Sequence, residues 1–229
     1  LKISNKLVSF HSYNENQKIN YLLSKLKRGE SIALVSDAGM PLISDPGENL
    51  VKFVRDQNYD VICIPGPCAL ITGLVSSGLS TSKFTFFGFV PKAKKERKVV
   101  LEKISFNLFT SIVYESPKRI LQFLLDLKNH CDGGRQIVLQ KEMTKRYESH
   151  ILNNLDNIID IIKDIDFKGE YTIVIEGIKV REQNVLINSN SIKNDLINLM
   201  KAGLSHSAAS NYLAKKSGIP KKDIYKLII

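Results

Sequence analysis

The chain has 229 residues, with 33 Lys and Arg against 23 Asp and Glu, a net charge of +10 and a pI near 9.4. A hydrophobic content of 43% and a charged content of 24% are typical of a folded protein, and exclude a disordered chain, a collagen-like fibre and a mucin-like stalk. No apolar run approaches the roughly 18 residues that a membrane span requires. The excess of positive charge favours a polyanionic partner such as nucleic acid.

The cysteines and the first residue bear on where the protein works. Cys63, Cys68 and Cys131 are an odd number without a C-x-x-C pair, which argues against a disulfide scaffold and a zinc site. We therefore expect no metal and a reducing, cytoplasmic location. The chain begins at Leu1 without a signal-peptide pattern, and we expect residues that precede Leu1 to be missing.

The first half of the chain begins with a predicted helix followed by a strand–loop–helix unit. Residues 16–28 carry apolar side chains at helical spacing. Residues 31–35 predict a buried strand, and the turn-rich loop 36–47 follows. At the end of this loop, Asp45 and Pro46 predict the cap and first turn of the next helix.

A second unit with the same order follows directly. It consists of a predicted strand over 60–64, the loop 65–69 and an apolar helix over 70–77. Two consecutive strand–loop–helix units predict a parallel sheet with crossover helices. We place this first α/β domain at residues 1–90.

The chain changes character at the basic segment 91–98, which carries five basic residues and one acidic residue. We place a domain boundary there and predict a second α/β domain over 91–180. Its elements are strands 110–114, 136–140, 148–152 and 171–176 and helices 117–127 and 155–165. A polar linker over 181–190 then precedes a C-terminal helical tail over 191–229, with helices at 192–201, 205–216 and 221–228.

Two loops rich in Pro and Gly carry the clearest binding signal. The glycine pattern G-x-G-x-x-G is absent and the four histidines have no ligand-like spacing, which argues against a dinucleotide fold and a metal site. The loops at 37–39 and 65–69 follow consecutive predicted strands, where open α/β sheets bind ligands. Their backbone groups suit an adenine, a ribose or a carboxylate, although each loop alone is also explained as a tight turn.

Six strings in chain order resemble the tetrapyrrole-methylase family. They are LVSDAGMPLISDPG (34–47), IPGPCALITGLVSSGL (64–79), FFGFVP (86–91), VYESPKRI (113–120), QKEMTKRYE (140–148) and GEYTIVIEG (169–177). The resemblance covers nearly the whole chain and is closest to the ribosomal branch, the 16S rRNA (cytidine-2′-O)-methyltransferases. Members of this branch begin with a strand and a G-T-P-I-G-N-L loop, followed by an E-D-T-R segment. All of these would precede Leu1, so the resemblance implies an N-terminal truncation.

The resemblance implies an α/β fold of two domains with S-adenosylmethionine in the cleft between them. The cofactor contacts that it implies are Asp37, Ala38, Gly39, Leu42, Cys68, Ala69, Tyr114, Glu115, Met143 and Gly177. It also implies a homodimer that acts on 16S rRNA in the small ribosomal subunit, with no membrane association.

The chemistry implied is in-line methyl transfer to a ribose 2′-oxygen of a cytidine in the decoding region. Glu142 or Glu115 is expected to act as base, and Lys145 or Lys141 to polarise the hydroxyl. RNA phosphates are expected at Lys94, Lys95, Arg97, Arg119 and Arg146. For each of these charged residues a structural ion pair or a solvated surface position stays an alternative.

Two other functions stay open. One is a small-molecule tetrapyrrole (precorrin-type) methylase of the same fold, against which the strings VYESPKRI and EMTK and the basic tail argue. The other is a non-catalytic RNA-binding fragment. Cofactor binding by the complete gene product would separate the fragment from both enzymes.

Overall fold

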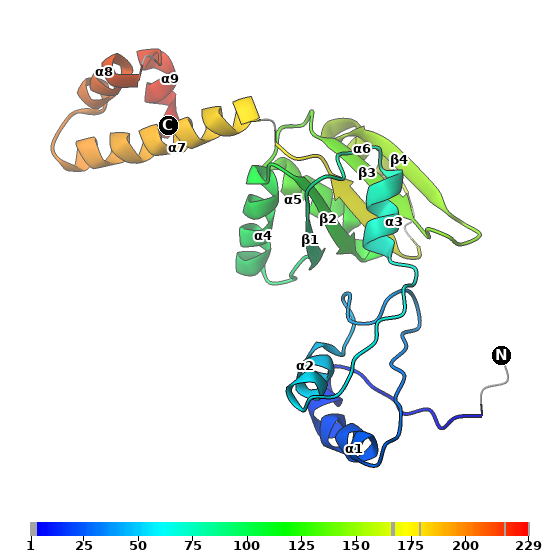
Figure 1. Cartoon of the computed structure of the whole chain (residues 1–229). Coiled ribbons are helices and arrows are strands. Elements are labelled where there is room, and N and C mark those ends of the chain that lie inside the picture. The colour runs from blue at the N-terminus through cyan, green and yellow to red at the C-terminus, as the bar shows by residue number, and fades with distance from the viewer. Residues whose placement is uncertain (1–3, 166–167, 179, 218, 229) are drawn as a thin grey trace.

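The structure is a computed structural model that describes residues 4–165, 168–178, 180–217 and 219–228. Figure 1 shows three parts in chain order: an N-terminal part with two helices, a central unit built on a sheet, and a C-terminal helical tail. In the N-terminal part the helices are α1 (Glu15–Lys27) and α2 (Glu48–Asp56). None of the helices in the described ranges is long and apolar enough to cross a membrane.

The central unit contains a five-stranded mixed sheet. Its strands are β1 (Phe84–Phe89), β2 (Thr110–Glu115), β3 (Gln136–Lys141), β4 (Ser149–Asn154) and β5 (Tyr171–Ile175). Their order across the sheet is β1-β2-β5-β3-β4, with β1 parallel to β2 and the other neighbours antiparallel. The predicted strands of the second half are therefore confirmed.

Helices cover both faces of this sheet. Successive strand residues point to opposite sides, and apolar side chains on each side pack against helices. On one face Val113 and Ile173 pack with Phe123 beneath α4 (Lys94–Phe106), α5 (Ile120–Lys128) and α6 (Leu155–Ile162). The alternate residues Ile112 and Val174 pack under α3 (Ala69–Ser76) on the other face. The four strand and helix side chains Ile112, Val113, Phe123 and Ile173 are 0% exposed, so the sheet is buried on both sides.

The two strands predicted in the first half are wrong. Residues 31–35 and 60–64 are not assigned to any strand, and they contain Val35, Ile62 and Ile64 with exposed fractions of 75%, 81% and 75%. A strand forms only where a neighbour takes its backbone hydrogen bonds. In the described ranges neither segment has such a neighbour, so the expected parallel sheet of a first domain is not present there.

Two predicted boundaries also differ from the structure. The expected domain boundary at residue 90 falls after β1, but β1 pairs with β2 and belongs to the central unit. The basic segment that suggested a break leads into α4, which begins at Lys94. The expected cap at Asp45 is also wrong, because α2 begins at Glu48 with Gly47 at the N-cap (φ 132°) and no side-chain cap.

The tail consists of α7 (Val180–Lys201), α8 (His206–Ser217), α9 (Lys221–Tyr225) and the 3₁₀ turn Lys226–Ile228. The predicted linker over 181–190 is part of α7, so the first tail helix is longer than expected. The tail has a core of its own, formed by Ile192, Leu196, Ala209, Leu213 and Ile224. It is therefore a small helical unit joined to the central unit through α7.

Candidate active site

A cavity of about 840 Å³ lies between the loops of the N-terminal part and one end of the central sheet. Its volume is within the roughly 300–1,000 Å³ of small-molecule sites. The sheet end follows from the strand register, in which Tyr114 and Glu115 at the end of β2 pair with Thr172 and Tyr171 at the start of β5. The segments that line the cavity are 10–11, 34–41, 43–46, 67–69, 114–117, 143–145 and 169–172, together with Thr72 and Phe89.

The two Pro- and Gly-rich loops predicted to bind a ligand meet at this cavity. Gly39 has a positive φ of 74°, and a Cβ there would lie 3.3 Å from the carbonyl oxygen of Pro67. A Cβ on Gly66 would lie 3.3 Å from the sulfur of Met40. The Ser36 hydroxyl donates a hydrogen bond to the Gly39 carbonyl oxygen at 2.7 Å, which closes the first loop on itself. Glycine is needed at 39 because its backbone is left-handed and close to the second loop.

Tyr114 joins α3 to the sheet at the wall of the cavity. Its hydroxyl accepts a hydrogen bond from the Leu70 amide at 2.9 Å, and Leu70 lies in the first turn of α3. The rings of Phe86 and Phe89 contact Tyr114 edge-on, with centroid distances of 4.9 and 5.6 Å. Burial raises the pKa of Tyr114 to about 12, and a nearby Cys68 contributes to the rise. The phenol is neutral at physiological pH, as at its ordinary pKa of 10, and the shift keeps it neutral to higher pH.

Glu115 is enclosed by positive charge beneath the cavity wall. Its carboxylate lies 3.2 Å from Arg119 and 3.8 Å from Arg97, and the side chain is 0% exposed. The other carboxylate oxygen accepts a hydrogen bond from the Ser116 amide at 2.8 Å. The carboxylate is thus held in place by two guanidinium groups and a backbone amide, out of contact with solvent. The geometry therefore favours a structural role for Glu115 over the expected role as base.

The same ion pairs change the expectation for two arginines. Arg97 is 8% exposed and also contacts Asp126 at 2.6 Å, and Arg119 donates to the Val90 carbonyl oxygen at 2.7 Å. Both guanidinium groups are thus engaged inside the protein, an arrangement that does not suit the expected role as phosphate contacts. In contrast, Lys94 and Lys95 are exposed in the first turn of α4.

Glu142, Lys145 and Glu170 form a charged cluster at the cavity. The Lys145 ammonium lies 2.7 Å from the Glu170 carboxylate and 3.3 Å from that of Glu142. Glu142 also accepts a hydrogen bond from the Glu170 amide at 2.7 Å, and left-handed backbone at Glu142 (φ 49°) and Thr144 (φ 64°) closes the turn. The turn thereby carries Lys145 to the wall of the cavity.

The contacts within this cluster fix its charge state. The Glu170 amide, and then Lys145, lower the pKa of Glu142. The hydrogen bond to Glu170, and then that to Glu142, raises the pKa of Lys145. Both shifts favour the charges that the two groups carry at neutral pH, which are positive on Lys145 and negative on Glu142.

The structure brings together most of the predicted cofactor contacts. Those that line the cavity are Asp37, Ala38, Gly39, Cys68, Ala69, Tyr114, Glu115 and Met143. Leu42 does not line it; its side chain lies within 3.0 Å of where a Cβ on Gly47 would be. Lys145 lines the cavity, whereas Lys141, Glu142 and Arg146 do not. The Arg146 guanidinium lies 5.6 Å from the ring centre of Tyr147, and both residues are exposed.

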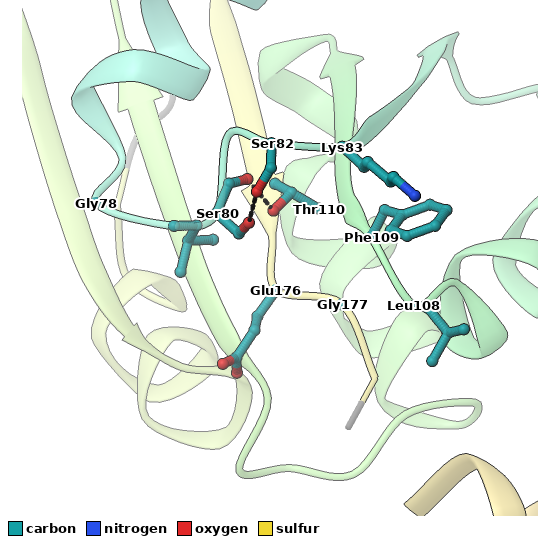
Figure 2. A pocket seen from close by; sticks show the side chains of 10 residues that line it. Gly78, Ser80, Ser82, Lys83, Leu108, Phe109, Thr110, Glu176 and Gly177 are labelled. Carbon is teal, nitrogen blue, oxygen red and sulfur yellow. Dashed lines mark hydrogen bonds between the residues drawn. The ribbon is translucent and has the colours of Figure 1, made fainter. Parts of the chain in front are cut away.

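Gly177 lies at the other end of the sheet. Ile175, two residues before it, pairs with Ser111 at the start of β2, far from the Glu115 end. There it lines a second cavity of about 450 Å³ with Glu176, Lys83 and Thr110. In Figure 2 the carboxylate of Glu176 and the amino group of Lys83 point to different sides, so the charged groups of this cavity do not converge. We therefore remove Gly177 from the candidate site.

Several residues of the cavity were missed from the sequence. They include Met40, Phe89, Gly169, Glu170 and Thr172. The string GEYTIVIEG contained a signal for the last three. Since β5 runs antiparallel to β2, it is the start of this string, and not its end, that reaches the cavity.

Comparison with known proteins identifies similar chains. The family model of the Tetrapyrrole (Corrin/Porphyrin) Methylases matches residues 3–159. "Ribosomal RNA small subunit methyltransferase I" of Synechocystis sp. is 37% identical over 99% of this chain and 81% of the relative. The protein of the same name from Haemophilus influenzae is 38% identical over 98% of this chain and 79% of the relative.

Solved structures share the fold at low sequence identity. The methyltransferase CobJ has a TM-score of 0.54 at 16% identity, covering 71% of each chain. Uroporphyrin-III-C-methyltransferase from Thermus thermophilus has a TM-score of 0.54 at 12% identity, covering 76% of this chain and 74% of that one. The expected α/β fold of the tetrapyrrole methylases is thereby confirmed.

Methyltransferases of this family use S-adenosylmethionine, and the cavity fits such a group. Met143, Pro67 and Phe89 supply apolar walls, and Asp37 and Thr172 supply polar groups. Such a lining suits a ligand that joins a flat nucleoside to a charged amino-acid part. In the described ranges no three His, Cys, Asp or Glu side chains lie together as a metal site would require.

Proposed function

Because the chain belongs to the tetrapyrrole (corrin/porphyrin) methylase family, we propose that it transfers a methyl group from S-adenosylmethionine to ribosomal RNA. One observation carries this proposal: the relatives named for the small ribosomal subunit match 98–99% of the chain. Their match includes the basic tail, which lies beyond the family match that ends at residue 159. The net charge of +10 is consistent with an RNA substrate.

The acceptor in this proposal is the ribose 2′-hydroxyl of a cytidine in the decoding region of 16S rRNA, within the small ribosomal subunit. The strings that resemble the ribosomal branch support this choice, since QKEMTKRYE builds the turn that carries Lys145 to the cavity. A nucleotide splayed out of folded RNA reaches a cavity more easily than one within a stem. The proposal includes a cytoplasmic homodimer as the active form.

S-adenosylmethionine supplies a methyl group on a sulfonium, which is electrophilic without further activation. The chain's own residues then have to bind, orient and handle one proton. Tyr114, neutral and held by Leu70, keeps α3 and its first residues Ala69 and Leu70 against the sheet. Lys145 places a positive charge at the cavity, which favours loss of the hydroxyl proton.

Glu142 is the proposed proton acceptor: it does not line the cavity itself, but it contacts Lys145, which does. Its carboxylate is ionised at neutral pH even at the ordinary pKa of 4.5, and the Glu170 amide and Lys145 lower this pKa further. Its carboxylate lies 3.3 Å from the Lys145 ammonium, so an oxygen bound near Lys145 would also be near Glu142. Lys141, Arg146, Lys94 and Lys95 are proposed to contact phosphates around the target nucleotide.

The direct test is methyl transfer by the full-length gene product. Tritiated S-adenosylmethionine is incubated with small subunits from a strain that lacks the activity, with free 16S rRNA and a tetrapyrrole precursor as comparison substrates. A single alkali-resistant cytidine in the labelled RNA is the expected result. Label only in the tetrapyrrole would contradict the proposal that RNA is the substrate. Cofactor binding without label in any of the three substrates would contradict the proposed acceptor.

A variant pair tests the role of Lys145. Lys145→Gln is expected to lower kcat at least about 100-fold, the usual lower limit for loss of a group that assists proton transfer. Lys145→Arg should restore part of this loss because the positive charge is kept. Lys163→Gln is the control, since Lys163 is exposed and its ion-pair distance to Asp160 is 3.9 Å. An equal kcat for Lys145→Gln and Lys163→Gln would contradict the assigned role.

A further inference from the structure

The basic tail, residues 191–228, is a strongly charged surface that the cavity chemistry does not use. It carries seven lysines and two aspartates: Lys193, Lys201, Lys215, Lys216, Lys221, Lys222 and Lys226, with Asp195 and Asp223. All seven lysines are exposed. Within the described ranges none of these lysines forms an ion pair with a carboxylate of the chain, although Lys221 donates a hydrogen bond to the Ser207 hydroxyl at 2.8 Å.

The tail stands away from the cavity. Its helices pack on their own core, in which Leu196 and Ile224 are 0% exposed. Figure 1 shows α7 leaving the sheet where β5 ends, with α8 and α9 folded against the far half of α7. The cavity lies at the opposite end of β5. The 22 residues of α7 correspond to a length of about 33 Å at 1.5 Å per residue.

The lysines concentrate around the junction of α8 and α9. The helix dipole accounts for Lys215 and Lys216 in the last turn of α8, but it does not favour a cation at the first residue of α9, where Lys221 lies. Tyr212 is 55% exposed and lies three and four residues before Lys215 and Lys216, on the same side of α8. An exposed aromatic ring beside several exposed lysines suits the phosphates and bases of RNA.

We propose that the basic tail binds the RNA substrate at a second place, remote from the methylated nucleotide. This inference rests on the proposed function, because it takes the substrate to be folded ribosomal RNA. A substrate large enough to reach both the cavity and the tail would bind more tightly than a short RNA that reaches only the cavity. The tail would thereby favour the small subunit over short RNAs of the same sequence.

The test removes four tail charges in the full-length protein. The tail variant is Lys215→Gln, Lys216→Gln, Lys222→Gln and Lys226→Gln, which leaves the Lys221–Ser207 hydrogen bond in place. The matched control variant removes the same charge from exposed lysines outside the tail: Lys6→Gln, Lys27→Gln, Lys52→Gln and Lys163→Gln. Thermal unfolding and circular dichroism establish that both variants are folded.

Methyl transfer is measured with small subunits and with a short stem–loop that contains the target nucleotide. For the tail variant we expect KM for the small subunit to rise about tenfold or more at unchanged kcat, with unchanged kinetics on the stem–loop. The slope of log affinity against log salt should fall by about 0.7–0.9 for each phosphate that the variant no longer neutralises. The control variant should change neither KM nor the slope to this extent.

Three outcomes would overturn the inference: equal effects of the tail and control variants, an equal loss on the stem–loop and the small subunit, or a change in oligomeric state with RNA affinity unchanged. The last outcome would show that the tail contacts protein. These failures are distinct from failure of the proposed function, in which the unmodified protein itself methylates no RNA.

Discussion

The central unit and the N-terminal part are built from similar apolar runs, yet they differ in how those runs are used. In the central unit, β2, β3 and β5 pair with neighbours and bury side chains such as Ile112 and Ile173 completely. In the N-terminal part, residues 31–35 and 60–64 are unpaired, and the core is a small cluster in which Leu22 and Leu50 are each 7% exposed. The difference shows that an apolar run becomes a strand only when a partner strand is present.

The cavity joins these two unlike regions. Its sheet side is placed by paired strands, whereas its other side consists of loops that approach closely, so that a Cβ at Gly39 would lie 3.3 Å from the Pro67 carbonyl oxygen. The hydrogen bond from the Leu70 amide to Tyr114 holds α3, which directly follows the second loop, to the sheet. We therefore expect ligand binding to depend on a few contacts across the cavity, and global stability to depend on the sheet.

The largest expected effect is in the central core. Phe123→Ala should lower the free energy of unfolding by about 3–5 kcal/mol, because Phe123 is 0% exposed and its removal leaves a void. Leu22→Ala in the α1–α2 cluster should cost about 2 kcal/mol, at the low end for such a change. Denaturant unfolding measures both. Equal losses would contradict the difference between the two regions.

Tyr114→Phe should lower stability by about 1–2 kcal/mol at neutral pH, because the Leu70 amide loses its acceptor. The folded-state pKa of about 12 lies above the ordinary value of 10, so the folded protein keeps the proton longer. Stability of the unmodified protein should therefore fall as pH rises from 10 to 12.

Thermal unfolding between pH 9 and pH 12 separates these effects. The Tyr114→Phe variant should show a shallower loss of stability over this range than the unmodified protein. Tyr147→Phe is the control, since Tyr147 is 69% exposed. Identical pH profiles for all three proteins would show that burial of the Tyr114 phenol does not affect stability.

Gly39→Ala and Gly29→Ala form a matched pair that tests the contact between the loops. Both glycines have positive φ, 74° and 80°, so each substitution should cost about 1–2 kcal/mol of backbone strain. A Cβ at Gly39 would also contact the Pro67 carbonyl oxygen, whereas a Cβ at Gly29 meets no atom within 4 Å. Calorimetry should show weaker S-adenosylmethionine binding only for Gly39→Ala, and equal binding would contradict the assigned position of this loop.

The smallest expected effect is at the Glu142 cluster, where side chains are partly exposed. The pKa of Glu142 is lower in the folded protein than its ordinary value of 4.5, so ionised Glu142 stabilises the fold at pH values above 4.5. This stabilisation is lost as the pH falls through the lower pKa of the folded state. Glu142→Gln should therefore reduce stability at pH 7 by less than about 1 kcal/mol and by nothing in strong acid. Unfolding at pH 7 and at pH 2 measures the stability change, with Glu102→Gln as the control. A loss of stability in Glu142→Gln that persists at pH 2 would point to packing instead of charge.

The sequence predicted the central unit well because its signals are local. Short apolar runs in TSIVYE and QIVLQK coincide with β2 and β3, and the helices predicted over 117–127 and 155–165 coincide with α5 and α6. The same reasoning failed at 31–35 and 60–64, because an apolar run does not indicate whether a neighbouring strand exists. It also failed at 181–190, where a polar composition concealed the first half of α7.

The candidate site was predicted in part. The loop residues Asp37, Gly39 and Cys68 do line the cavity, although the strands expected to precede both loops do not form. The sequence could not show that Arg119 is held in an ion pair, or that Gly177 lies at the end of the sheet away from the cavity. The partner of Arg119 is a carboxylate enclosed beneath the cavity wall, and the position of Gly177 depends on the direction of β5.

The sequence by itself determined the charge, the helices and strands of the central unit, and the family to which the six strings belong. Only the tertiary structure decided which residues share the cavity, which charges are neutralised inside the protein and which apolar runs stay unpaired. The reason is that helical spacing and short apolar runs are patterns that involve only a few neighbouring residues. A hydrogen bond such as Leu70 to Tyr114, or an ion pair such as Arg97 to Glu115, joins residues that only the folded chain brings together.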